Sequence, residues 1–139
     1  RMHVVEPELP FEYSSLDLVI LFAVLTCIPD GREQEELMEE LHRIIRPGGY
    51  LYISDLLLNE DARNLARYQE FAEKGYTYGA FDLPEGISCR HHREDYLRND
   101  LLVDWEEISV EPMQVHTMNG NTSNAIQLLL RKFDPTQEF

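Results

Sequence analysis

The sequence has few basic residues and no long apolar run. Lysine and arginine number 12 against 26 aspartate and glutamate residues, which gives a formal net charge of −14 over 139 residues. Nucleic acids and anionic membranes bind basic patches, so this balance excludes both as expected partners. The longest mainly apolar run, residues 16–28, contains Asp17 and is much shorter than the roughly 20 residues of a membrane-spanning helix.

Cysteine and glycine are also informative by their scarcity and placement. Cys27 and Cys89 lie far apart in the sequence, in contexts typical of reduced thiols, so we expect a cytoplasmic protein. None of the seven glycines forms a G-x-G-x-x-G or Walker arrangement, so the sequence contains no loop of the kind that cradles phosphates. With 43% apolar residues, the length predicts one globular domain.

Several segments are predicted to be strands. Residues 16–25 form a continuous apolar run with β-branched members, typical of a strand covered on both faces, although a buried helix is the alternative. Residues 2–5 and 50–57 indicate two more strands. Residues 105–115 and 125–131 indicate a closing antiparallel hairpin. Pro112 places the first strand of that hairpin at an edge or a bulge.

Helices are predicted between these strands. Asp30 is a good N-cap for a helix that carries an apolar stripe and that Pro47-Gly48-Gly49 would end. Asp61 caps a second helix that ends near Gly75, and residues 93–102 indicate a third. Residues 76–88 are predicted to be a long loop or lid. The order predicts an α/β fold with a mostly parallel sheet, helices on its faces and a C-terminal antiparallel hairpin.

Three stretches carry a resemblance to a known family. Residues 4–11, Val-Val-Glu-Pro-Glu-Leu-Pro-Phe, are similar to a strand exit with an acidic residue before Leu-Pro-Phe. Residues 16–30 resemble a following strand that ends in Pro-Asp, and residues 41–53 resemble a helix, a Pro-Gly-Gly turn and the next strand. In this order the stretches resemble the C-terminal part of class I, Rossmann-like S-adenosylmethionine-dependent methyltransferases.

The resemblance implies a partial methyltransferase fold. Residues 1–133 would be the C-terminal part of the domain, with residues 76–92 as a substrate-side lid, and residues 134–139 would be a tail. The family's glycine-rich cofactor loop and the ribose-binding acid are not matched, so we expect a truncated fragment that is inactive alone. The full-length protein would transfer a methyl group from S-adenosylmethionine to a small-molecule acceptor.

The resemblance also implies cofactor-binding residues. An adenine ring needs an apolar slot and one hydrogen-bond acceptor for its amino group. Glu6 is the expected acceptor, with Leu9, Pro10 and Phe11 beside it, and Leu21, Phe22 and Ala23 would form the floor of the pocket. The alternatives are that Glu6 is a solvated loop acid and that Phe11 and Phe22 are ordinary core residues.

Acceptor-side residues are expected between positions 76 and 92. His91 or His92 is the expected catalytic proton acceptor, because imidazole titrates near neutral pH. Arg90 is expected to bind a carboxylate or phosphate, and Tyr76, Tyr78 and Phe81 to form the wall of the acceptor site. The alternative for Cys89–His92 is a turn with exposed imidazoles. No second ligand pair lies at zinc-site spacing, so no metal is expected.

Two other functions remain open from the sequence. The chain would alternatively be a non-catalytic α/β interaction module, or, with less support, a nucleotide-sugar or dinucleotide-dependent enzyme. In the methyltransferase interpretation, residues 16–25 would be an exposed sheet edge with a single charge at Asp17. Exposed edges pair with other chains, so we expect self-association, most simply as a dimer.

Overall fold

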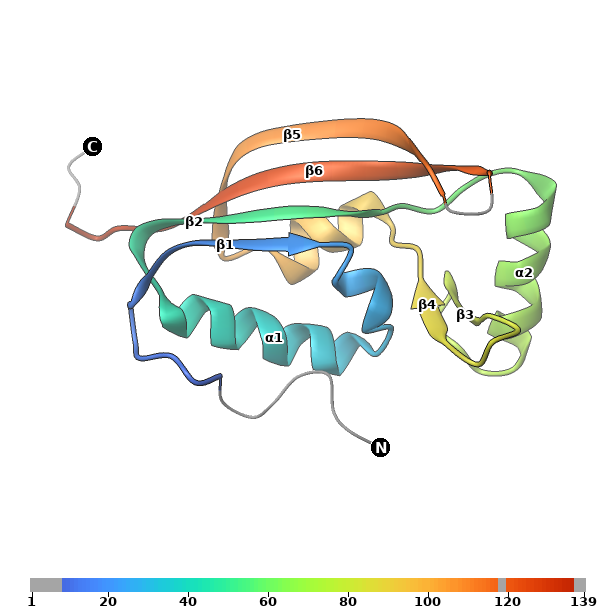
Figure 1. Cartoon of the computed structure of the whole chain (residues 1–139), viewed down its shortest axis with the longest axis horizontal. Helices are drawn as coiled ribbons and strands as arrows, with labels where there is room; N and C mark the ends of the chain where they lie inside the picture. The colour runs from blue at the N-terminus through green and yellow to red at the C-terminus, as the bar shows by residue number, and fades with distance from the viewer. Residues whose placement is uncertain (1–8, 118–119, 137–139) are drawn as a thin grey trace.

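The computed structural model describes residues 9–117 and 120–136, and the strand predicted at residues 2–5 lies outside them. A four-stranded sheet extends along the long axis of the molecule. Helix α1 lies along one face of the sheet, and α2 lies with a small hairpin at one end (Figure 1). Among the described residues no helix is long and apolar enough to cross a membrane.

The first half of the chain follows its local sequence signals. Strand β1 (Leu16–Phe22) is followed by a 3₁₀ turn, η1 (Leu25–Cys27), and by helix α1 (Gly31–Ile44). Asp30 caps α1 as predicted, because its Oδ1 accepts hydrogen bonds from the backbone N–H groups of Arg32 at 2.8 Å and Glu33 at 3.4 Å. The strand predicted for residues 16–25 is also confirmed, and it ends at Phe22, three residues before the predicted end.

Strand β2 (Ile45–Leu56) begins directly after α1, so the prediction that Pro47-Gly48-Gly49 ends the helix is wrong. The three residues instead form an irregularity within β2. The parallel register jumps there from the pair Leu16–Ile45 to the pair Leu18–Tyr50. Gly48 has a φ of +81°, a conformation that side chains other than glycine rarely adopt.

The middle of the chain forms a separate small unit. Helix α2 (Ala62–Glu73) is capped by Asp61, whose carboxylate accepts from the Asn64 N–H. The long loop predicted for residues 76–88 contains strand β3 (Ala80–Asp82), which pairs antiparallel with β4 (Ser88–Arg90). These strands are too short to show a periodic sequence pattern, and they form because α2 packs against them.

The chain closes with a helical turn and a hairpin. After the π-type turn η2 (Tyr96–Leu101), strands β5 (Trp105–His116) and β6 (Thr122–Lys132) complete the sheet in the order β1-β2-β6-β5. The α/β fold class is confirmed, but the sheet is not mostly parallel. Only β1 and β2 pair in parallel, because the closing hairpin supplies both other pairings.

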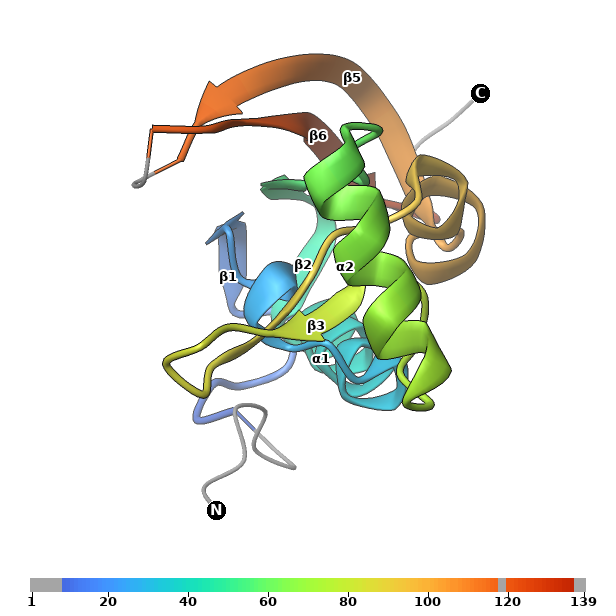
Figure 2. The same ribbon diagram turned by 90° about the vertical axis from the view of Figure 1, so that its right-hand side faces the viewer.

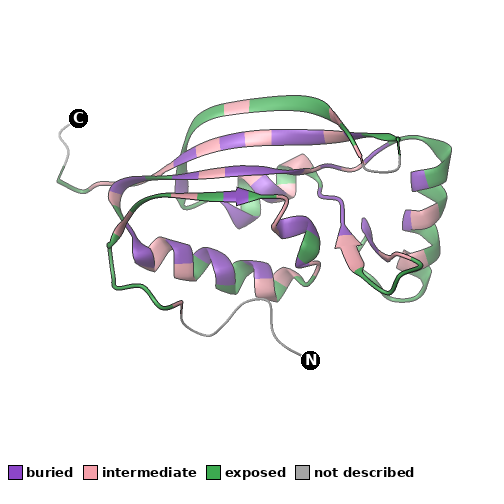
Figure 3. Cartoon of the chain, viewed as in Figure 1, coloured by how far each residue is buried: buried purple, intermediate pink, exposed green. Residues whose placement is uncertain are grey.

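Burial differs between the two faces of β1 (Figure 3). Leu21 is buried on the side of α1, whereas Leu18, Ile20 and Phe22 are 50%, 60% and 73% exposed. Of the described residues, only those on one side cover this strand, so the prediction of cover on both faces is wrong. The opposite edge of the sheet is β5, which contains Pro112 as expected for an edge strand.

Candidate functional site

A cavity of about 1240 Å³ lies where the carboxyl ends of β1 and β2 meet α2 and the β3–β4 hairpin. Figure 2 shows α2 and this hairpin side by side at that end of the sheet. Residues after β1 and β2, the outer face of α2, the hairpin and the β5–β6 turn all contribute to its lining. Open α/β sheets bind ligands at this edge, and the volume suits a small molecule.

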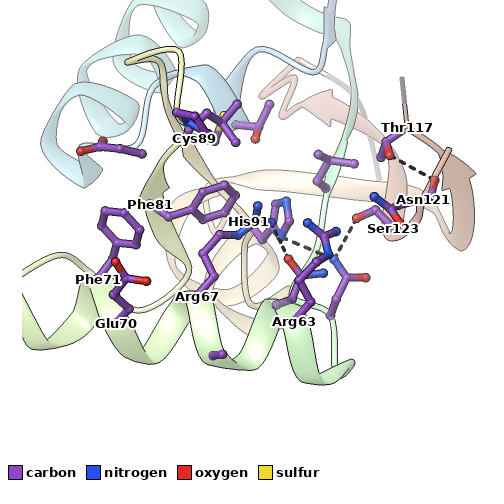
Figure 4. A pocket seen from close by; sticks show the side chains of 18 of the residues that line it. Arg63, Arg67, Glu70, Phe71, Phe81, Cys89, His91, Thr117, Asn121 and Ser123 are labelled. Atoms are coloured by element: carbon purple, nitrogen blue, oxygen red, sulfur yellow. Dashed lines mark hydrogen bonds between the residues drawn. The ribbon is translucent and has the colours of Figure 1, made fainter. Parts of the chain in front are cut away.

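Helix α2 presents the basic side of the cavity (Figure 4). Arg63 and Arg67 are four residues apart and therefore lie on the same face of the helix. The guanidinium of Arg67 lies over the ring of Phe81, with 3.7 Å from its central carbon to the ring centroid. It donates from Nη2 to the Asn64 side chain, while its buried Nε has no hydrogen-bond partner in the part of the chain that the structure describes.

His91 lines the cavity from the end of the hairpin. The Tyr68 hydroxyl accepts from the Asn59 backbone N–H at 3.0 Å, so its own proton points to His91 Nδ1, 2.6 Å away. This arrangement leaves the imidazole proton on Nε2. Burial and then the charges of Arg67 and Arg63 lower the pKa of His91 to about 4, so the ring is neutral at pH 7.

His91 is therefore not available as the predicted proton acceptor in this arrangement. A neutral imidazole with its proton on Nε2 offers the cavity a hydrogen-bond donor, whereas its lone pair at Nδ1 is engaged by Tyr68. The alternative of exposed imidazoles at positions 91 and 92 is wrong, because the two residues are only 7% and 1% exposed. Contacts with distant residues bury them, and a single-sequence pattern does not record such contacts.

His92 faces the core and is not among the residues that line the cavity. Its Nδ1 lies 3.1 Å from the Leu56 carbonyl oxygen and its Nε2 lies 3.0 Å from Gln34 Nε2. The carbonyl can only accept, so Nδ1 carries the proton and Nε2 faces the Gln34 amide, which His92 shares as a donor with the carbonyls of Leu25 and Ile28. Burial lowers the pKa of His92 to about 3. The structure therefore separates the two predicted catalytic histidines into a cavity residue and a core residue.

Asp55 lies near His92 at the end of β2. Its Oδ1 is 3.7 Å from His92 Nδ1, but the low pKa of His92 keeps the ring uncharged, so the two do not form an ion pair at pH 7. Burial raises the pKa of Asp55 to about 6 even though the backbone N–H groups of Leu56 and Thr26 donate to its carboxylate. The carboxylate joins the loops that follow β1 and β2.

One glycine fixes the base of the hairpin against His91. The Gly79 carbonyl accepts from the His91 backbone N–H at 2.9 Å, and Gly79 has a φ of +100°. A Cβ at this position would lie 2.3 Å from the His91 carbonyl oxygen, closer than packed atoms ever approach. Only glycine allows the two backbones to meet here, and this contact sets the position of His91.

The predicted acceptor-side residues divide into two groups. Phe81 lines the cavity, together with His91. Tyr76 donates from its hydroxyl to Asp82 at 2.6 Å, Tyr78 packs against Tyr68, and neither lines the cavity. Arg90 is buried, with its guanidinium 4.4 Å from the Tyr96 ring centroid and bonded to the Pro29 carbonyl. Arg90 therefore anchors the loop before α1 and does not face this cavity.

The predicted cofactor-binding residues are not brought together. Leu9, Pro10 and Phe11 lie at the last turn of α1, where the Arg43 guanidinium donates to the carbonyls of Leu9 and Phe11. Leu21, Phe22 and Ala23 lie at the opposite end of the sheet, at the end of β1. Glu6 lies outside the described residues. Of the residues predicted to bind the adenine ring, only those at the end of β1 lie at the carboxyl ends of the parallel strands.

Sequence analysis missed the residues that dominate the cavity. Arg63, Arg67, Asn59 and Ser123 line it, and Tyr68 orients His91 from behind. The spacing of the two arginines on a capped helix was the one available local pattern. Asn59 and Ser123 are 64 positions apart and meet only through folding, with 3.0 Å between Asn59 Nδ2 and Ser123 Oγ. Among the described residues, no three histidine, cysteine, aspartate or glutamate side chains converge as metal ligands.

Comparisons with known proteins point to one fold. A family model described as a methyltransferase domain matches residues 2–53. A S-adenosylmethionine-dependent methyltransferase from Methanosarcina mazei is 25% identical, with a TM-score of 0.80 over 92% of this chain and 64% of its own. The 1,6-didemethyltoxoflavin-N1-methyltransferase of Burkholderia thailandensis, solved with its substrate and S-adenosylhomocysteine, is 15% identical, with a TM-score of 0.60 over 92% of this chain and 48% of its own.

The fold is thus that of class I S-adenosylmethionine-dependent methyltransferases. The chain spans 64% or less of the length of these first two structures. The [4+2]-cyclase SpnF is also similar, at 16% identity and a TM-score of 0.59 over 94% of this chain and 54% of its own, so the fold does not by itself specify a reaction. A search of curated proteins returned no match.

Proposed function

We propose that this chain belongs to a S-adenosylmethionine-dependent methyltransferase and that the cavity beside α2 binds its small-molecule acceptor. The fold and the match of residues 2–53 to a methyltransferase domain support the reaction class. The position of the cavity at the carboxyl ends of β1 and β2 is the observation that carries the assignment of the acceptor site.

The described residues fit only part of a methyl-donor site. Phe22 is 73% exposed at the end of β1, and Ala23 follows it with a φ of +56°, so this segment offers an apolar surface for the donor. Bound S-adenosylmethionine would supply an electrophilic methyl group. The task of the residues around the cavity is to hold the acceptor in line and to keep water out, since methyl transfer needs little other help from the protein.

The coverage of known methyltransferases supports a second element of the proposal. Because the chain spans 64% or less of their length, we propose that it is the C-terminal part of the domain and binds the cofactor weakly alone. Calorimetry with S-adenosylhomocysteine on this chain and on a longer form of the protein tests this. Weak or no binding by the chain and micromolar binding by the longer form are expected. Micromolar binding by the chain alone would contradict it.

A blocked cavity tests the acceptor site in the longer form. Ala66 lines the cavity from the exposed side of α2, and neighbouring Leu65 is 44% exposed but does not line it. Ala66→Trp should lower methyl transfer at least tenfold across a panel of small acceptors while S-adenosylhomocysteine binding is kept. Leu65→Trp is the matched control and should leave both unchanged. Equal effects of the two variants would remove the cavity from the proposal.

We also propose that the chain self-associates through residues 16–25, with a second copy of itself as the partner. β1 is an edge of the sheet, and Leu18, Ile20 and Phe22 present apolar side chains there with Asp17 as the single charge of the strand. Sedimentation of the chain at micromolar concentration should show a dimer that Ile20→Lys dissociates. A monomer of 16.3 kDa in the unsubstituted chain would refute the proposal.

A further inference from the structure

We propose that the acceptor carries an acidic group beside an apolar or aromatic ring, and that Arg63, Arg67 and the Nε2–H group of His91 bind this group. The inference rests on the proposed function, because it names the class of molecule that the cavity beside α2 would accept. The shared chemistry is an oxyanion, either a carboxylate or a phosphate, since both are bound by paired guanidinium groups.

The two arginines stand out in so acidic a chain. Among the described residues, arginines such as Arg43 and Arg98 lie within 3 Å of glutamate oxygens. Neither Arg63 nor Arg67 has a carboxylate oxygen within 4.0 Å among those residues. Asp61, the acid one turn before them, is engaged as the cap of α2 by the Asn64 backbone and side chain. Two guanidinium groups that have no carboxylate oxygen of a described residue within 4.0 Å therefore line the same cavity, and the charge of Asp61 acts on both from a longer distance.

Arg67 is held in place but incompletely bonded. Stacking on Phe81 fixes the plane of its guanidinium, and its bond to Asn64 uses one of five N–H groups. Its buried Nε donates to no atom of the described residues. An unpaired donor destabilises a folded protein, and this one persists at the surface of a cavity, where an oxyanion would complete its bonding after a small rotation of the side chain.

His91 adds a neutral donor to this cationic pair. Its Nδ1 is occupied by the Tyr68 hydroxyl, and its Nε2 makes no hydrogen bond to any described residue. Its ring lies 5.0 Å from the Phe81 ring, so it borders the same aromatic wall as Arg67 (Figure 4). A donor that stays uncharged strengthens the contact with an oxygen without the desolvation that a buried imidazolium would require.

The acids of the cavity do not cancel this arrangement. Glu70 pairs with Lys74 at 3.4 Å, and Asp82 accepts from the hydroxyls of Tyr76 and Ser88 at 2.6 Å each. Glu85 lies on the connection between β3 and β4. Phe81 and Leu83 provide an apolar part of the lining. The expected ligand therefore places its oxyanion at α2 and its ring against Phe81.

Small aromatic probes test the inference without any methyl transfer. Benzoate, phenyl phosphate and the uncharged isostere benzamide would each be titrated into the chain, followed by calorimetry and by amide chemical shifts. Benzoate or phenyl phosphate should bind at least tenfold more tightly than benzamide, with shifts at residues 63–67 and 91. The stronger of the two anions identifies the oxyanion as carboxylate or phosphate. Equal affinity for all three probes would overturn the inference.

Single charge removals test the residues. Arg63→Gln is the primary variant, because Arg63 is exposed, and Arg67→Gln is the second. Each should weaken binding of the anion about tenfold and leave benzamide unchanged. Arg32→Gln is the matched control, on a side chain 86% exposed on α1, and should change neither. An equal loss of anion affinity in all three variants would mean that the net charge of the protein explains the effect, and it would refute the site.

The outcomes separate this inference from the proposed function. Arginine-dependent anion binding combined with no methyl transfer by the longer form of the protein would support the anion site and contradict the reaction. Methyl transfer to neutral acceptors with no loss in Arg63→Gln would support the reaction and contradict the anion site. A two-dimensional spectrum of the histidine ring nitrogens adds a readout for His91, which should hold its proton on Nε2 in the free protein and with the anion bound.

Discussion

Helices α1 and α2 bury different kinds of side chain, although the two are nearly equal in length. α1 buries Leu37, Met38, Leu41 and Ile44 against the sheet, with Gln34 as its one buried polar residue. α2 buries only Asn64 and Tyr68. The region around α2 instead encloses polar groups from other elements, among them Asn59, His91 and Ser123.

This difference indicates that the α1 region mainly provides stability, whereas the α2 region positions polar groups. Apolar burial is the main source of folding free energy, so the α1 side should hold the sheet together. Buried polar groups add little net stability even when they are hydrogen-bonded, but they fix donors and acceptors in position. The α2 side therefore resembles binding sites in general, which occupy the less stable part of a fold.

The largest expected effect breaks the α1 side. Leu41 is 2% exposed at the centre of the core. Leu41→Ala should lower the free energy of unfolding by about 2–5 kcal/mol, because it removes buried methyl groups and leaves a cavity. Urea denaturation followed by circular dichroism measures the loss. Glu39→Ala, on the exposed face of the same helix, is the control and should change stability little.

The second effect tests the two buried histidines. His92→Ala should lower the free energy of unfolding by about 2–4 kcal/mol, because the Gln34 amide and the Leu56 carbonyl each lose one hydrogen-bond partner and a cavity remains. His91→Gln should cost less, since its Nε2 has no partner to lose, yet it should weaken anion binding. If the two variants exchanged these effects, the division into a core histidine and a cavity histidine would be wrong.

The third effect depends on pH. Both histidines have a pKa below the ordinary value of 6.5, at about 4 and about 3, so the unfolded chain takes up protons first as pH falls. The stabilising contribution of the two histidines is fully present above pH 6.5. Between pH 7 and pH 5, each histidine should lower the free energy of unfolding by about 2 kcal/mol. Asp55, with a pKa raised to about 6, takes up its proton in the folded state and offsets about 1 kcal/mol.

Urea titrations at pH 7, 6 and 5 measure this net loss of about 3 kcal/mol. His92→Gln should flatten the dependence by removing one titrating group from the balance. Leu41→Ala sharpens the comparison with α1, because it should lower the stability at every pH and leave the slope unchanged, since Leu41 lies within the apolar core cluster. A slope that is unaffected by His92→Gln would contradict the assignment of the pKa shift to this residue.

The smallest effect concerns the outer face of α2. Leu65 is 44% exposed and makes no contribution to the core cluster. Leu65→Ala should change the free energy of unfolding by less than about 0.5 kcal/mol, in contrast with the same truncation at Leu41. The same urea titrations measure both. A loss as large as that of Leu41→Ala would mean that another surface covers α2 in solution.

Local signals in the sequence predicted elements well. Asp30 and Asp61 begin helices because a cap acts within three residues, and the apolar run from Leu16 predicts β1. The end of α1 was predicted three residues late, because Ile45 pairs with β1 and leaves the helix before Pro47 requires it. Pairing of this kind depends on another part of the chain, so the local sequence does not record it.

The site was harder to predict for the same reason. Phe81 and His91 were identified from their place between strands, and both line the cavity. The contacts that define their chemistry join positions far apart, such as Tyr68 with His91 and Gln34 with His92. Leu9 to Phe11 were predicted beside the end of β1, but Arg43 binds their carbonyls at the other end of the sheet.

Gly79 has a consequence for how this protein could acquire new substrates. Any side chain at this position would collide with the His91 backbone and displace the hairpin, so random mutagenesis should return almost no functional variants there. Leu83, Pro84 and Glu85 line the same cavity from the far end of the hairpin, away from that contact. A library for altered acceptor preference should therefore vary these three positions and keep Gly79 constant. The His91 imidazole would then keep its position while the opposite wall of the cavity changes shape.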